Sequence, residues 1–141
     1  MAPYIHIPKK QQQRFITSAV SAYEKDLEYM EMFSYEEIKG EFYIREFFIL
    51  AFAEQTSTSI SFYLKEYRRV KKQILSSGRK VGCIHTHLDY EEAVPSLADW
   101  KGTGACDEGL MGICSLWSAG NKIKSSINYW IPELPCKKIY N

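Results

Sequence analysis

Two of the three histidines in this chain, His85 and His87, are separated by a single residue. The stretch from Lys80 to His87 is predicted to be a buried strand that enters a polar loop. Side chains alternate between the two faces of a strand, so both imidazoles are expected on one face. Imidazole nitrogen is a preferred zinc ligand, and two such groups on one face can converge on one ion. The pair therefore predicts a metal site.

Asp99 follows His87 by twelve residues and offers an oxygen ligand. Pro95 and Ser96 are predicted to begin a helix with Asp99 in its first turn. Two histidines, one carboxylate and a water would make an open, catalytic zinc site. The competing interpretation is a capping box, in which Ser96 caps the helix and Asp99 reaches back to it. A strand with two partly exposed histidines and no metal is the matching alternative for the pair.

The pattern H-x-H, eight residues, then S-x-x-D, running from His85 to Asp99, resembles the JAMM motif of the JAB/MPN metalloprotease family. The strand lead-in Val81 to Ile84 is similar to that family too. Its motif also has an upstream glutamate, commonly written E-x-x-G, and Glu37 to Gly40 fits that pattern. The resemblance implies a single α/β (α+β) domain over residues 1–141, of the MPN/JAB type, with a mixed sheet flanked by helices.

The resemblance also implies a role for each site residue. One zinc ion per chain would be held by His85, His87 and Asp99. Glu37 would take a proton from the attacking water and return it to the leaving amine. Ser96 would donate a hydrogen bond to the developing oxyanion.

The upstream glutamate has competitors. Glu36 and Glu41 are close neighbours of Glu37, although Glu36 would face the opposite side of a regular strand. Glu37 could also be an ordinary exposed carboxylate at a strand edge. Leu88 stands where the family usually has proline, and the following loop is one residue longer than usual, so the departures from the family concern the loop.

The function implied by the resemblance is that of a zinc-dependent isopeptidase or peptidase. It would cleave after the C-terminal glycine of a ubiquitin-like protein, in conjugates or in precursors. A peptidase acting on a sulfur-carrier adduct and a non-catalytic MPN scaffold protein are the alternatives. A metallo-β-lactamase site is excluded because Tyr90 stands where H-x-H-x-D-H needs a histidine, and His6 is the only other histidine. The oligomeric state and the particular substrate stay open.

Composition bounds these expectations. The 141 residues are 45% hydrophobic and 25% charged, which is typical of one soluble globular domain. The net charge of +1 gives no general attraction to nucleic acid or acidic membranes. No apolar run is long enough to span a bilayer and no signal peptide is evident, so a cytoplasmic location is expected. The four cysteines form no C-x-x-C pair and are interpreted as ordinary thiols.

Apolar spacing predicts the elements that position the site. In chain order these are a helix from Lys10 to Met32, two strands within residues 37–53 that fold back near Ile44 to Glu46, a loop at Thr56 to Ser59, a helix from Leu64 to Gly78, and strands over 80–87, 110–117 and 127–131.

Overall fold

The structure is a computed structural model that describes residues 2–96, 109–131 and 134–141. Its elements, in chain order, are β1 (Tyr4–Ile7), α1 (Lys9–Glu24), β2 (Met30–Ile38), β3 (Glu41–Phe48), β4 (Phe52–Gln55), β5 (Ile60–Phe62), α2 (Leu64–Ser76), β6 (Lys80–Leu88), β7 (Met111–Ala119), β8 (Lys122–Ile131), β9 (Leu134–Pro135) and β10 (Lys137–Tyr140). The expected mixed α+β class is confirmed.

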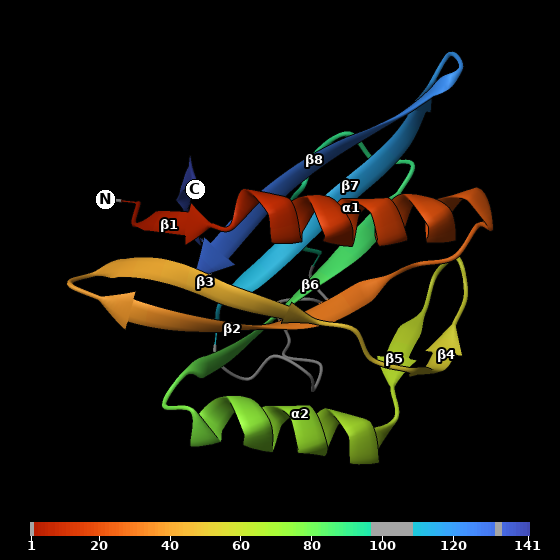
Figure 1. Ribbon diagram of the computed structural model, residues 1–141. Coiled ribbons are helices and arrows are strands. Elements are labelled where there is room, and N and C mark those ends of the chain that lie inside the picture. The colour runs from red at the N-terminus through yellow and green to blue at the C-terminus, as the bar shows by residue number, and fades with distance from the viewer. Residues whose placement is uncertain (1, 97–108, 132–133) are drawn as a thin grey trace.

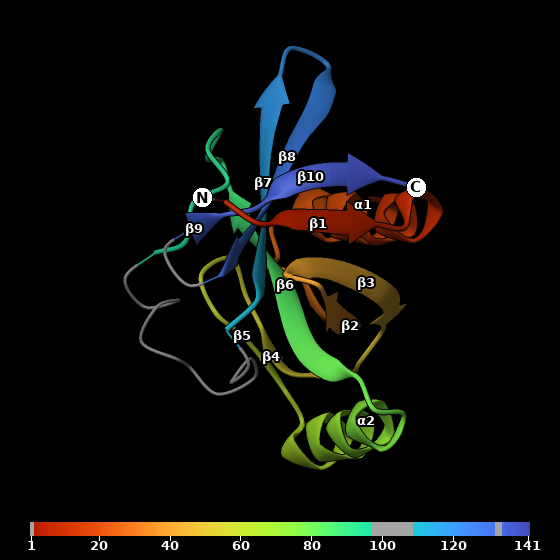
Figure 2. The same cartoon turned by 90° about the vertical axis from the view of Figure 1, so that its left-hand side faces the viewer.

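One eight-stranded sheet dominates the molecule, in the order β10-β1-β3-β2-β6-β7-β8-β9. β1 runs parallel to both β3 and β10, and β6 runs parallel to β7, whereas the other neighbours are antiparallel. The Lys138 Nζ of β10 donates to the Ile127 carbonyl of β8 at 2.6 Å, which brings the two ends of the sheet together. The sheet is therefore strongly curled and nearly closed (Figure 2).

The two helices pack on opposite faces of the β2–β6 pair (Figure 1). Phe15 and Ala19 of α1 belong to one buried cluster, which includes Phe33 and Ile84 from the sheet. A second buried cluster joins α2 to the sheet through Val70, Ile74, Met32, Val81 and Cys83. Alternate residues of β6 thus supply the two cores, as strand geometry requires.

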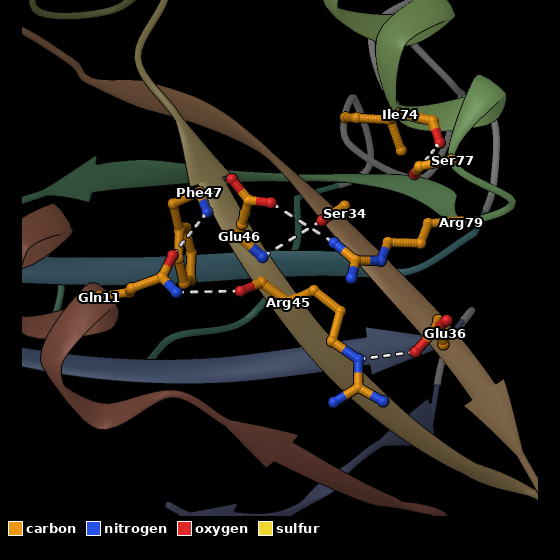
Figure 3. Close-up of polar contacts among 9 residues, drawn as sticks. All are labelled: Gln11, Ser34, Glu36, Arg45, Glu46, Phe47, Ile74, Ser77 and Arg79. Carbon is orange, nitrogen blue, oxygen red and sulfur yellow. Dashed lines mark hydrogen bonds and ion pairs between the residues drawn. The ribbon is translucent and has the colours of Figure 1, made fainter.

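Two side-chain contacts tie α1 to β3, and a third ties β2 to β3 (Figure 3). Gln11 donates to the Arg45 carbonyl at 3.0 Å and accepts from the Phe47 backbone N–H at 3.1 Å. Ser34 accepts from the Glu46 backbone N–H at 3.2 Å, beside an irregularity in the β2–β3 register. These bonds satisfy polar groups of β3 where the ladder alone does not.

Two predicted boundaries are wrong. The first helix ends at Glu24, because Asp26 adopts a left-handed φ of 58° and the N–H groups of Asp26 and Leu27 donate to carbonyls of the last turn. The first strand turn lies at Lys39 and Gly40, with φ of 52° and 80°, and not near Ile44. Positive φ at both central residues is the two-residue hairpin turn that matches strand twist.

The second helix and the strands before and after the candidate site are confirmed. α2 ends just before Gly78, whose φ is 82°. β6 covers the predicted range, β7 begins one residue later than predicted, and β8 begins five residues earlier than expected. The prediction of ordinary thiols is wrong for Cys83, which is disulfide-bonded. Cys114 and Cys136 are buried free thiols, and Cys106 lies outside the described residues. Within the described part of the chain, neither helix is long and apolar enough to cross a membrane.

Candidate metal centre

The two histidines share one face of β6, near its carboxyl end. Their ring centroids are 5.2 Å apart and the rings are inclined by 58°. Both side chains are half-buried, whereas Val81 and Cys83 on the same face are fully covered. Two imidazoles bound to one tetrahedral zinc through bonds of about 2 Å hold their ring centres roughly 5 Å apart. The donor type and the spacing therefore fit one zinc ion.

Thr86 fixes the strand between the two histidines. Its side chain is fully buried on the opposite face, and its Oγ1 accepts a hydrogen bond from the Tyr29 backbone N–H at 2.8 Å. The Thr86 backbone N–H donates to the Tyr29 carbonyl at 2.9 Å. Both bonds join β6 to the start of β2, so the backbone that carries the histidines is held from the side facing α1.

Glu28 lies two residues before β2, the strand that pairs with the histidine strand. The antiparallel alignment of β2 and β6 sets Met30 opposite His85. Continued by two residues, it sets Glu28 opposite His87, and alternation gives Glu28 the same face as the histidines. Directly opposed residues have Cβ atoms about 4.5–5.5 Å apart. The side chain is half-buried.

The backbone at Glu28 is anchored by the β4–β5 hairpin. Its N–H donates to the Thr56 carbonyl at 2.8 Å, and its carbonyl accepts from Gln55 Nε2 at 2.9 Å. The sequence interpretation missed Glu28 because it assigned the residue to the first helix. The signal that could have found it is its place just before a strand neighbouring the histidine strand.

Glu31 is close to Glu28 in sequence, but its side chain lies on the opposite face of the sheet. It is fully buried and accepts from both guanidinium nitrogens of Arg14, at 2.5 and 2.6 Å, and from the Tyr29 hydroxyl at 2.5 Å. Burial, and next the hydrogen bond to Glu31, raise the pKa of Tyr29 well above its usual value. The hydrogen bond to Glu31 likewise raises the pKa of Arg14. This fully partnered network supports the structure behind the site.

The structure does not bring Glu37 to the histidines, which corrects the expected base. Glu37 lies seven residues beyond Met30 on β2, about 23 Å along the strand at about 3.3 Å per residue. Its carboxylate is 3.6 Å from Lys80 Nζ, at the opposite end of β6. Gly40, which completed the E-x-x-G match, is a hairpin residue with positive φ.

The two competing glutamates lie at the same remote end. Glu36 accepts from Arg45 at 2.7 Å (Figure 3), and Glu41 is 2.7 Å from His6. Neither approaches the carboxyl end of β6, where the histidines are. All three candidates of the E-x-x-G region therefore belong to the β2–β3 hairpin and its ion pairs.

Asp99, the expected third ligand, lies outside the described residues, as does the helix predicted to carry it. Ser96 ends the described segment after β6 and is exposed. Just before it, Ser115 Oγ donates to the Glu92 carbonyl at 2.7 Å and Trp130 Nε1 to the Ala93 carbonyl at 3.1 Å. These bonds hold the segment leading to Ser96 against β7 and β8.

No cluster of three or more His, Cys, Asp and Glu side chains able to hold an ion occurs among residues 2–96, 109–131 and 134–141.

An ordered turn follows the second histidine. Asp89 adopts a φ of 64°, and its N–H donates to the Leu116 carbonyl at 2.7 Å. The Tyr23 hydroxyl of α1 donates to the Asp89 carboxylate at 2.5 Å, and this bond raises the pKa of Tyr23. The turn sets the Tyr90 ring edge-on to His87 at 6.2 Å while 65% of Tyr90 stays exposed. Tyr90 is thus an aromatic wall beside the histidines.

Comparisons with known proteins bear on the fold alone. No protein-family model and no curated protein matches the chain. Among the solved structures that resemble it is the solution structure of protein DSY2949 from Desulfitobacterium hafniense, with a TM-score of 0.66 and 15% sequence identity. The match covers 97% of this chain and 92% of that one. The arrangement of strands and helices is therefore shared with a protein of quite different sequence.

Proposed function

We propose that this chain is a zinc-dependent peptidase of the MPN/JAB type that cleaves after the C-terminal glycine of a ubiquitin-like protein. The observation that carries the proposal is the His85–His87 pair, two half-buried imidazoles on one strand face at the spacing a shared zinc ion needs. The order of H-x-H and S-x-x-D along the chain, which resembles the JAMM motif, supports the same function.

His85, His87 and Asp99 would hold the ion. When bound, zinc polarises a carbonyl and lowers the pKa of water to about 7. Three protein ligands leave a position open for water or substrate, which is the arrangement of catalytic and not of structural zinc sites.

Proton transfer falls to Glu28 in this proposal, in place of Glu37. If the β2–β6 register, whose first pair is Met30 and His85, continues by two residues, Glu28 would stand opposite His87, within reach of a water attacking beside the histidines. Its carboxylate would take the proton of that water and return it to the leaving amine. Ser96 would donate its hydroxyl hydrogen bond to the carbonyl oxygen as negative charge develops there.

Tyr90 supports a substrate with a narrow tail. An exposed ring edge-on to His87 limits the width of whatever approaches the pair from that side. A tail ending in two glycines has no side chains to meet such a wall. Tyr90 would therefore favour a Gly-Gly end over a bulkier one.

The first test is metal content, measured by plasma mass spectrometry on purified protein. We expect about one zinc per chain in the wild type, and its loss in the His87→Ala and Asp99→Ala variants. His6→Ala is the matched control, because His6 lies on β1 beside Glu41 and should keep the ion bound. Absence of zinc after the metal is supplied would contradict the peptidase and leave the scaffold alternative.

The second test separates substrates. Ubiquitin-like proteins carrying a Gly-Gly end would be offered as an isopeptide conjugate, as a linear fusion and as a sulfur-carrier adduct. Cleavage of the first two, followed by intact mass, supports the proposed function. Cleavage of the adduct alone would favour the sulfur-carrier alternative.

A further inference from the structure

The positive charges of the chain are concentrated in and after α2. Residues 64–80 contain seven of the eighteen Lys and Arg residues and only one acidic residue, Glu66. The net charge of the whole chain is only +1, so the remainder of the molecule is net negative. The cations of this segment are Lys65, Arg68, Arg69, Lys71, Lys72, Arg79 and Lys80.

Most of the charge on the exposed side of α2 is not neutralised by the residues that the structure describes. Lys65, Arg68 and Lys72 are exposed and form no ion pair with any residue in the described ranges. Arg69 has Glu66 at 4.0 Å, a long contact between partly solvated groups. Arg68 and Lys72 are four residues apart, and like charges at this spacing destabilise a helix. A solvated helix gains nothing from this arrangement.

A pocket opens on the same side of the helix. Its volume is about 450 Å³, and it is lined by Arg68, Lys71, Lys72, Leu75 and Ser76. Leu75 is 47% exposed there, so an apolar wall stands beside the cations. Tyr63 and Leu64, 54% and 59% exposed, extend the apolar surface at the start of the helix.

The combination of cations and exposed apolar side chains on α2 indicates what kind of partner could bind there. A nucleic-acid backbone would neutralise the cations but leave Leu75 in water. An acidic polypeptide satisfies both parts, with carboxylates on the cations and an apolar side chain in the pocket. The pocket is wide open to solvent, so it would hold a side chain against its wall without enclosing it.

We propose that the exposed face of α2 docks an acidic polypeptide segment of a partner protein, with carboxylates on Arg68 and Lys72 and an apolar side chain against Leu75. The helix packs on the sheet through Val70 and Ile74, on its other side. The exposed residues Arg68, Lys72 and Leu75 are not among those that pack α2 on the sheet, and the proposal does not depend on the zinc site.

The test is fluorescence anisotropy with two labelled peptides of equal charge, one of glutamate and glycine and one of glutamate and leucine. We expect saturable binding of the leucine peptide by the wild type, weakened by raising the salt. Arg68→Glu with Lys72→Glu should weaken it at least tenfold. Leu75→Ser should weaken the leucine peptide and leave the glycine peptide unchanged.

The control is Lys122→Glu with Lys124→Glu, which makes the same change of charge at two exposed positions of the β7–β8 hairpin. Thermal unfolding would verify that all variants fold. Full binding by the control supports the proposal. No saturable binding by the wild type, equal loss in both double variants, or tighter binding of single-stranded DNA than of the leucine peptide would overturn it.

Discussion

Thr86 gives β6 two different sides. The histidines beside it in sequence emerge on the face where α2 packs, while Thr86 itself is buried toward α1 and bonded to Tyr29 in both directions. Successive side chains of a strand point to opposite faces. The histidines therefore lie on one face of β6, and the residue that anchors the strand lies on the other. Changes on the α1 side would act on the site only through the position of the backbone.

At the residue scale, Glu28→Gln should abolish most hydrolysis and leave zinc content unchanged. The amide cannot accept the proton, and removal of a positioned base typically costs about 10²–10⁴-fold in rate. The measurement is turnover of a Gly-Gly conjugate together with metal analysis. Glu37→Gln is the control, since it removes only an exposed contact with Lys80. Loss of activity in the control and not in Glu28→Gln would return the role to Glu37.

Ser96→Ala tests the second catalytic role. Loss of one donor to the developing oxyanion should reduce turnover by about 10²–10³-fold with zinc still bound. The rate would be measured at saturating substrate, so that a change in binding alone does not count. Unchanged turnover would leave Ser96 as a helix cap.

The histidine pair could be predicted from sequence because alternation along one strand is a local rule. Glu37 was selected because Gly40 completed a four-residue pattern, although that glycine is needed for the turn between β2 and β3. Glu28 could not be found locally. Its role depends on which strand pairs with β6 and in which register, and neither follows from the residues around it.

At the element scale, the close contact between β6 and the core explains why residue 82 is a glycine. A Cβ placed there would overlap the ring of Phe33, which is fully buried and has no room to move. Gly82→Ala should therefore destabilise the protein by about 1–3 kcal/mol through overpacking. Urea unfolding would measure it. Gly78→Ala is a useful comparison, because its Cβ meets nothing within 4 Å and only its φ of 82° opposes the change.

Elements with a strong local period were the predictable ones. Val70 and Ile74 give α2 a buried side, and Gly78 stops it. The first helix was extended too far because Leu27 and Met30 continue its spacing by coincidence, and Asp26 is a weak stop signal compared with glycine. The short strands β1 and β10 pair in parallel across almost the whole chain, which no local pattern reveals.

At the scale of the whole molecule, buried tyrosine hydroxyls make the free energy of unfolding fall as the pH rises in the alkaline range. Burial raises the pKa of Tyr129 far above its usual value, and its hydroxyl donates to Gln12 at 2.8 Å. In the unfolded chain a tyrosine ionises near pH 10. The contribution is therefore complete below about pH 10 and is lost as pH rises from there through the folded value.

Tyr129→Phe should accordingly have two effects on the free energy of unfolding. At neutral pH it should lower it by about 1–3 kcal/mol, because Gln12 Oε1 loses its buried donor. Between pH 9 and 11 the decline with pH should be shallower than in the wild type. Urea unfolding across this range would measure both, and an identical slope for the two proteins would contradict the assignment.

The concentration of cations on α2 also gives an almost neutral molecule a large electric dipole moment. Near an anionic surface, such a molecule experiences a torque before it makes contact. The torque would rotate the molecule until α2 faces the surface. At physiological ionic strength this turning acts only within about 8 Å, the screening length of the solution. The protein should therefore be retained by a cation-exchange resin even slightly above pH 7.6, the isoelectric point calculated from its composition, with α2 facing the resin.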